Sequence, residues 1–182
     1  MKKRIKDYVF LFGLAGVVVA LDQVTKTIVR TNLALGETWM PWKWLAPYAR
    51  FVNWKNTGAA FGIGQGLGDI IAILAIIVIL LIIYYFPQVP HEDWSLRIAM
   101  GLQLGGALGN LIDRIVHGFV TDFISVGTFA VFNIADSSIS IGVAVLLIGM
   151  WFNEHRKEGE KTGQDASTEN DPILVVKDKP SD

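Results

Sequence analysis

Residues 68–86, GDIIAILAIIVILLIIYYF, decide the class of the fold. Most of these side chains are aliphatic, Asp69 is the one charged residue, and Pro87 follows directly. A helix needs about 20 residues, at about 1.5 Å each, to cross the roughly 30 Å hydrocarbon layer of a membrane. Because the segment is apolar on every side, it predicts a transmembrane helix with extensive lipid contact.

The composition of the whole chain agrees with a membrane location. Of 182 residues, 52% are apolar and only 18% are charged, which is too apolar for an ordinary soluble domain. The net charge of −1 gives no reason to expect a nucleic-acid partner. Without cysteine the chain has no disulfides and no thiolate nucleophiles. The three histidines stand in separate segments without metal-ligand spacing, so we expect no metal and no cofactor.

Three more segments are long and apolar enough, or nearly so, to span the membrane. The four predicted spans are 8–29, 68–86, 96–112 and 134–152. We therefore predict one all-α membrane domain over residues 1–152, with outer segments at 30–67 and 113–131. Residues 153–182 are polar and of mixed charge, and we expect them to form a largely disordered cytoplasmic tail.

Basic residues set the predicted orientation of the bundle. Lys2, Lys3, Arg4 and Lys6 precede the first span, so the positive-inside rule places the amino terminus in the cytoplasm. Four crossings return the carboxyl terminus to the same side. A cleavable signal peptide is the alternative interpretation of this start, but no small-residue cleavage pattern follows it.

Small and aromatic residues predict how the helices and the first outer segment pack. Gly101, Gly105 and Gly109 recur every fourth position and form a smooth stripe that lets another helix backbone approach closely. The segment 30–67 is rich in tryptophan, which favours the headgroup zone of a membrane. This pattern predicts a segment that lies on the membrane surface. A simple belt of aromatic side chains at the membrane boundary is an equally good interpretation. We also predict short strands around residues 50–54.

Two aspartates beside apolar sequence are the strongest chemical signal. Asp122 lies in VTDF and Asp136 in FNIADSS, where an ionised carboxylate is costly and needs a reason to be present. If the intervening loop folds back over the bundle, the two carboxyls meet in a partly dry pocket and share one proton. Such a pair supplies a base for water and an acid for a scissile carbonyl, although the sequence does not assign the two roles.

Each aspartate alone has a simpler interpretation, and the pair has rival functions. Asp136 alone could cap the fourth helix. A proton-coupled transporter or channel also uses carboxylates within the membrane, but these acids cluster at one edge and no polar column runs through the second span. A structural scaffold would leave the paired aspartates without a purpose.

Other polar residues near the predicted spans have mixed interpretations. Asp22 and Lys26 stand four apart and can pair along one helix face, which indicates a structural role. Asp113 is expected to organise the end of the third span, whereas the guanidinium of Arg114 could hold substrate carbonyls. The side-chain amides of Asn110 and Asn133 can both donate and accept hydrogen bonds. They could orient a carboxylate or the substrate backbone, or they could simply make hydrogen bonds within the bundle.

Five motifs, in this order, resemble the bacterial lipoprotein signal peptidases of the signal peptidase II family. They are DQVTK at 22–26, NTGAAFG at 56–62, GGALGNLIDR at 105–114, VTDF at 120–123 and FNIADSS at 132–138. The resemblance covers roughly residues 22–152. It implies an aspartic endopeptidase of the inner membrane that cuts diacylglyceryl-modified prolipoproteins just before the lipidated cysteine.

Carried over residue by residue, the resemblance assigns the site. It implies that Asp122 and Asp136 are catalytic, that Asp22, Lys26 and Asp113 are structural, and that the substrate-binding or supporting residues are Asn56, Gly58, Asn110, Arg114 and Asn133. It also implies a small extracytoplasmic strand cradle, a surface-lying amphipathic helix within 30–67, and an active site near the outer face. We expect a multi-pass monomer whose partners are the prolipoprotein and membrane lipid.

Overall fold

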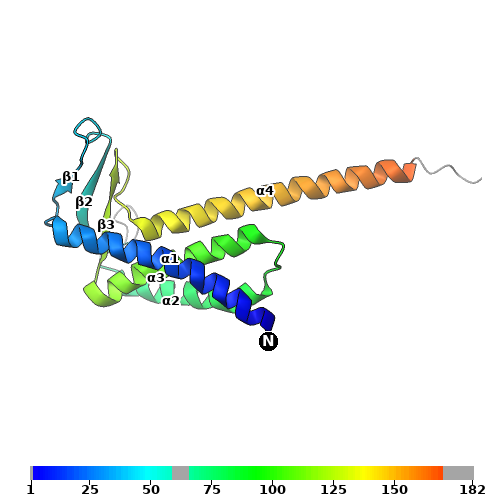
Figure 1. Cartoon of the computed structure of the whole chain (residues 1–182), viewed down its shortest axis with the longest axis horizontal. Coiled ribbons are helices and arrows are strands. Elements are labelled where there is room, and N and C mark those ends of the chain that lie inside the picture. The colour runs from blue at the N-terminus through cyan, green and yellow to red at the C-terminus, as the bar shows by residue number, and fades with distance from the viewer. Residues whose placement is uncertain (1, 59–65, 170–182) are drawn as a thin grey trace, which may run out of the picture. The chain divides into compact units, whose positions relative to one another are not determined.

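The computed structural model describes residues 2–58 and 66–169, which form four α-helices and one small antiparallel sheet (Figure 1). In chain order the elements are α1 (Lys2–Asn32), β1 (Thr38–Trp39), β2 (Ala49–Asn56), α2 (Gly68–Tyr85), the 3₁₀ turn η2 (Phe86–Gln88), α3 (Trp94–His117), β3 (Val120–Val126) and α4 (Ile134–Glu169). The chain divides into two compact units, Met1–Leu146 and Leu147–Asp182. The first unit holds the helix core, the sheet and the start of α4.

Three of the four predicted spans form helices that are long and apolar enough to cross a membrane. Within the described residues these helical segments are Ile5–Asn32, Gly68–Gln88 and Ile134–Phe152. The second is apolar all round, and most of its large side chains are exposed, as expected for a helix in lipid. It ends in η2, where Pro87 cannot continue an α-helix.

The third predicted span forms as α3, but polar residues keep it from reaching the apolarity of the other three. Arg97 donates from Nη2 to Asp7 Oδ1 of α1 at 2.8 Å, and its guanidinium lies 4.5 Å from the ring centre of Phe86. At the other end of α3, Asn110 and Asp113 are buried. The polar side chains of this helix therefore contact other protein groups. Such contacts offset the free-energy cost of placing polar groups within a membrane bundle.

The glycine stripe of α3 packs closely against another helix, as predicted, and the structure shows that this helix is α1. A Cβ atom added at Gly101 would come within 2.7 Å of Leu14, one at Gly105 within 2.6 Å of Val18, and one at Gly109 within 2.7 Å of Asp22. Real Cβ atoms do not approach other atoms this closely. Glycine at these positions thus brings the α1 and α3 backbones together and carries Asp22 and Lys26 toward α3.

We expect Gly105→Ala to destabilise the fold, because its new methyl group would overlap Val18 and the carbonyl oxygen of Ala15. Overpacking of this kind costs about 1–3 kcal/mol. Gly13→Ala on α1 is the matched control, since nothing lies within 4 Å of its added Cβ. Thermal unfolding in detergent should show a lower midpoint for Gly105→Ala alone. Equal midpoints for the two variants would contradict close α1–α3 packing.

The three strands form one antiparallel sheet in the order β1-β2-β3. The strand predicted near 50–54 is β2, while β3 was not predicted as a strand. The register of β3 with β2 places Asp122 opposite Trp54 and Val120 opposite Asn56. Side chains alternate across a strand, and the register shift between Phe51 and Trp54 changes which residues of β2 face those of β3.

Two other predictions for the segments around the core have a partial outcome. The surface-lying helix expected within 30–67 does not form in the described residues 33–58 and 66–67, which hold strands and turns; residues 59–65 lie outside the described residues. The predicted tail boundary at residue 153 falls inside α4, which continues to Glu169. No proline occurs between residue 134 and Pro172 to end that helix earlier. Residues 170–182 lie outside the described residues.

Candidate active site

Asp122 enters the site from the middle of β3. Its side chain is 1% exposed, and two neutral amides donate to it. Asn56 Nδ2, at the end of β2, donates to Asp122 Oδ2 at 2.8 Å, and Asn133 Nδ2 donates to Oδ1 at 2.7 Å. Asn56 is itself oriented by the backbone N–H of Gly58, which donates to its Oδ1 at 2.9 Å. Both oxygens of Asp122 are therefore held by fixed donors.

Asp136 enters from the first turn of α4. Asn110 Nδ2 of α3 donates to Asp136 Oδ1 at 2.7 Å, and the backbone N–H of Asn133 donates to Oδ2 at 3.2 Å. In return, the backbone N–H of Asp136 donates to Asn133 Oδ1 at 3.0 Å. This reciprocal pair is a capping box, in which Asn133 is the cap and Asp136 the third helical residue. The capping role considered for Asp136 belongs to Asn133.

Asn133 joins the two carboxyl groups. Its side-chain nitrogen contacts Asp122 and its backbone nitrogen contacts Asp136. Both aspartates line one cavity of about 500 Å³, although they come from a strand and a helix. The walls include Asn56, Gly58, Asn110, Arg114 and the aromatic side chains Phe129 and Phe132. Of the ten residues that the sequence assigned to the site, seven line this cavity or, like Asn133, link its two acids.

The environment of Asp122 favours its protonated form. The pKa of Asp122 is raised from 3.8 to about 7, chiefly by burial and next by the negative charge of Asp136. The hydrogen bonds from Asn56 and Asn133 act against this rise. A carboxyl with such a pKa can hold a proton near neutral pH, which is the state that a proton donor in amide hydrolysis requires.

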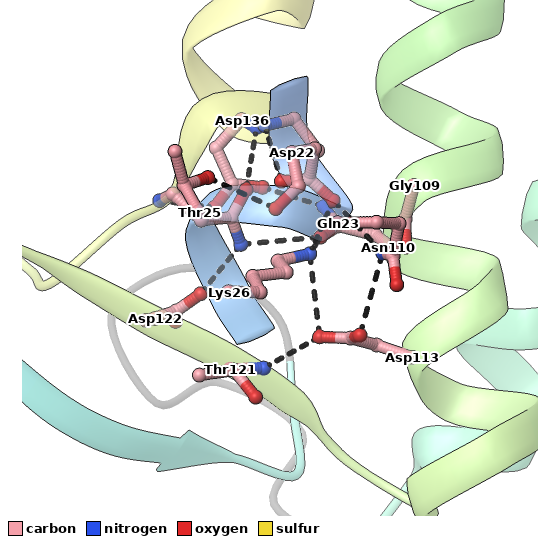
Figure 2. Close-up of polar contacts among 12 residues, drawn as sticks. Asp22, Gln23, Thr25, Lys26, Gly109, Asn110, Asp113, Thr121, Asp122 and Asp136 are labelled. Atoms are coloured by element: carbon pink, nitrogen blue, oxygen red, sulfur yellow. Dashed lines mark hydrogen bonds and ion pairs between the residues drawn. The ribbon is translucent and has the colours of Figure 1, made fainter. Parts of the chain in front are cut away.

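A buried cation, Lys26, lies among the acidic and amide side chains of the site (Figure 2). Lys26 Nζ lies 2.8 Å from Asp22 Oδ2 and 3.3 Å from Asp113 Oδ2, and all three side chains are 0% exposed. The ammonium also donates to Asn110 Oδ1 at 2.9 Å. The predicted Asp22–Lys26 pair on one helix face thus forms. Asp22 in addition accepts a hydrogen bond from the backbone N–H of Ala135, at 3.0 Å, which fixes the start of α4.

Asp113, near the end of α3, contacts both β3 and α1. Its Oδ2 accepts a hydrogen bond from the backbone N–H of Thr121 at 2.9 Å, and its Oδ1 lies 3.2 Å from Arg30 Nη1. These contacts tie β3 to both α1 and α3 one residue before Asp122. Arg114 points elsewhere: its Nη2 donates to the carbonyl oxygen of Gly58 at 3.1 Å. The adjacent Asp113 and Arg114 therefore serve different contacts.

Sequence reasoning missed three polar residues of this network. Gln23 donates to the carbonyl oxygen of Gly109 at 3.0 Å, and Arg30 donates to Thr121 Oγ1 at 3.0 Å. Helical spacing offered a signal for Arg30, since it follows Asp22 and Lys26 at four-residue intervals on the same face of α1. For Thr121 no signal existed, because its role depends on the register of β3.

Comparison with known proteins gives a consistent answer. The family model described as Signal peptidase (SPase) II matches residues 14–152. The lipoprotein signal peptidase of Shouchella clausii is 42% identical over 75% of this chain and 89% of its own length. That of Staphylococcus carnosus is 33% identical over 87% of this chain and 99% of its own length.

Solved structures agree with these relatives. One described as a bacterial membrane enzyme, solved by the in meso method, has a TM-score of 0.74 and 34% identity, and covers 81% of this chain and 90% of its own. A second with the same description has a TM-score of 0.68 and 35% identity, and covers 77% and 91%. The match spans every element of the site, from Asp22 to Asp136, and the chain belongs to the signal peptidase II family of aspartic peptidases.

Proposed function

We propose that this protein removes the signal peptides of prolipoproteins and that Asp122 and Asp136 are its catalytic pair. The observation that carries the proposal is the meeting of the two carboxyl groups at one cavity, linked by Asn133. Asn56, Asn110 and Asn133 donate to the two groups. The cavity of about 500 Å³ beside them has room for a water molecule and a peptide segment. A pair of this kind performs acid and base steps without a covalent intermediate.

The chemistry needs one proton shared between the two groups. The ionised carboxylate takes a proton from water, whose oxygen then forms a bond to the scissile carbonyl carbon. The protonated carboxyl gives its proton to the carbonyl oxygen. When the tetrahedral intermediate collapses, the first group returns its proton to the amide nitrogen and the C–N bond breaks. The second group recovers its proton from a hydroxyl of the intermediate, so the pair ends as it began.

The surrounding residues support this scheme through contact with the substrate backbone. Arg114, half-buried in the cavity wall, presents a guanidinium that can donate to peptide carbonyl oxygens. Asn56, Asn110 and Asn133 orient the two carboxyls, and buried Gly58 holds Asn56 and Arg114 through its own backbone. We assign these residues to support of the pair and binding of the substrate.

The proposed setting is the cytoplasmic membrane, with four crossings and both termini inside. Basic residues before α1 support this orientation. The sheet and the site lie near the opposite end of α1, where Arg30 contacts Thr121 of β3. Exposed tryptophans 39, 42, 44 and 54 on the sheet and its loops suit the outer headgroup zone. A substrate anchored by acyl chains would present its cleavage site, before the lipidated cysteine, at that depth.

Purified protein in detergent, incubated with a diacylglyceryl-modified prolipoprotein, tests the proposal. We expect release of the signal peptide with the new amino terminus at the lipidated cysteine, as measured by mass spectrometry. The same precursor without its lipid is the control and should remain uncut or be cut far more slowly. A transporter would cleave neither precursor, and failure to cut the lipidated one would refute the proposed activity.

The pH dependence of cleavage should be bell-shaped, with an alkaline limb near pH 7. Above the pKa of Asp122, about 7, the pair loses its shared proton and no acid remains for the carbonyl oxygen. At low pH both groups are protonated and no base remains. Rates measured at saturating substrate from about pH 5 to about pH 9 check this. A rate that stays constant as the pH rises above neutrality would contradict the assignment of Asp122 as a proton carrier.

A further inference from the structure

Lys26 makes more contacts than a structural ion pair needs. A buried ammonium is costly unless it is paired, and Asp22 and Asp113 already surround it with two negative charges. Its third contact is with a neutral amide, that of Asn110. At 2.9 Å, Nζ donates to Oδ1 of Asn110, whose own amide nitrogen contacts Asp136.

This third contact fixes the direction of the Asn110 amide. An ammonium group can only donate, so the Asn110 atom that faces Lys26 must be the oxygen. The amide nitrogen must then face Asp136, to which it donates at 2.7 Å. If the amide were reversed, its NH₂ would face the ammonium and its oxygen would face a carboxylate. Both contacts would then be repulsive, so Lys26 prevents that orientation.

The second amide in the site strengthens the same arrangement. Asn133 accepts the backbone N–H of Asp136 at Oδ1, which turns its nitrogen toward Asn110 Oδ1 at 3.1 Å and Asp122 Oδ1 at 2.7 Å. The oxygen of Asn110 thus accepts from a cation and an amide together. Polarisation along such a chain strengthens the next hydrogen bond, here the one that Asp136 receives.

The two aspartates consequently sit in different environments. Asp136 accepts from the polarised amide of Asn110 and from a backbone N–H at the start of α4, where the helix dipole favours negative charge. The donors to Asp122 are the side-chain amides of Asn56 and Asn133, and it lies on a strand. We propose that Lys26 is a positioning residue that fixes the amide of Asn110 and keeps the negative charge on Asp136, which makes Asp136 the general base and Asp122 the general acid. This inference rests on the proposed function.

Other charged groups around Lys26 set the sign of the expected effect. Those that face it or its partners are Asp22 and Arg30 on α1, Asp113, Arg114 and His117 on α3, Asp122 on β3 and Asp136 on α4. Removal of the Lys26 charge leaves two carboxylates that oppose ionisation of a third. The base should then gain its proton at higher pH, so the acid limb of the rate profile should move upward.

The test compares Lys26→Met with Arg30→Met through full pH profiles of kcat and KM on lipidated precursor. Arg30 is the matched control because it also pairs with Asp113, at 3.2 Å, one turn along α1, but it donates to Thr27, Asp113 and Thr121 and not to Asn110. For Lys26→Met we expect kcat near pH 7 to fall about 10- to 100-fold, the acid limb to rise by about one pH unit, and KM to change little. Arg30→Met should leave the acid limb in place.

A charge-balanced variant covers the case in which Lys26→Met does not fold. Lys26→Met with Asp113→Asn removes one positive and one negative group together. Because the contact of Lys26 with Asn110 is still lost, the acid limb should again move upward, but by less than in Lys26→Met. An unshifted acid limb in whichever of the two variants folds overturns the inference, as does a shift confined to the alkaline limb. If variants of Asp122 or Asp136 retain normal cleavage, the proposed function itself is wrong. If those variants are inactive but the Lys26 variants show an unshifted acid limb, only the proposed role of Lys26 is wrong.

Discussion

Asp122→Asn and Asp136→Asn are each expected to abolish cleavage of lipidated precursor, with losses on the order of 10⁴-fold, the scale seen when one member of a catalytic set is removed. An amide can neither take a proton from water nor supply one to a carbonyl oxygen at neutral pH. The change preserves size and shape, but one carboxylate oxygen becomes an amide nitrogen, so each variant loses one of the two hydrogen bonds that its aspartate accepts. Single-turnover assays at pH 7 would measure both losses.

The thermal stability of Asp122→Asn separates lost chemistry from lost folding. The pKa of Asp122 is raised in the folded protein, from 3.8 to about 7, so the folded state holds this proton more tightly than the unfolded chain. Stability from this group is therefore fully present below about pH 4 and is lost as the pH rises through about 7. The asparagine variant escapes this loss. Its thermal midpoint, relative to wild type, should rise between pH 4 and pH 8.

Two results would contradict the catalytic pair. One is cleavage by both asparagine variants at near-normal rates. The other is a thermal midpoint of Asp122→Asn that falls well below wild type at every pH, since the lost activity would then reflect an unfolded protein. Ser140→Ala is a useful comparison, because its exposed hydroxyl lies on the cavity rim and donates only to the carbonyl oxygen of Asp136, at 2.9 Å.

The apolar segments made much of the helical framework predictable. Periodicity and length place α1, α2 and α4 because lipid demands long apolar helices. The stripe of glycines on α3 predicted a close helix contact, and the structure supplies its partner, α1. The same physics explains why α3 resembles a membrane span least. Its polar residues are there for contacts with Asp7, Lys26 and Asp136, which only the folded arrangement reveals.

The two aspartates could be selected from sequence, but the way they are held could not. Their burial follows from the apolar context of VTDF and FNIADSS. Their meeting depends on β3, a strand whose register with β2 brings Asn56 to Asp122. The orientation of each amide depends on a backbone N–H or a lysine distant in the chain. The contact of this network that could be predicted was the ion pair of Asp22 and Lys26, because the two residues stand four apart on one helix.

Asn133→Ala should be the most damaging substitution outside the two acids, because one side chain serves both of them. Its amide donates to Asp122 at 2.7 Å and to Asn110 at 3.1 Å, and its oxygen caps α4 at the backbone N–H of Asp136. Loss of an N-cap costs about 1 kcal/mol, which a stable bundle should survive. Loss of the donor leaves Asp122 with Asn56 and Asn110 with Lys26 as donors, but it removes the one side chain that joins the two acids, so their relative placement is no longer fixed.

We therefore expect Asn133→Ala to lower kcat by about 10²-fold or more, with a much smaller change in KM, since misplacement of catalytic groups by about 1 Å has effects of that size. Asn53→Ala is the matched control. Asn53 is an asparagine of the same end of the molecule, half-buried where Asn133 is fully buried, but its amide donates to the carbonyl oxygen of Leu33 at 2.9 Å and it does not line the cavity. Equal loss of activity in both variants, at equal thermal midpoints, would show that Asn133 acts no differently from any structural amide, and the link between the two carboxyls would lose its catalytic meaning.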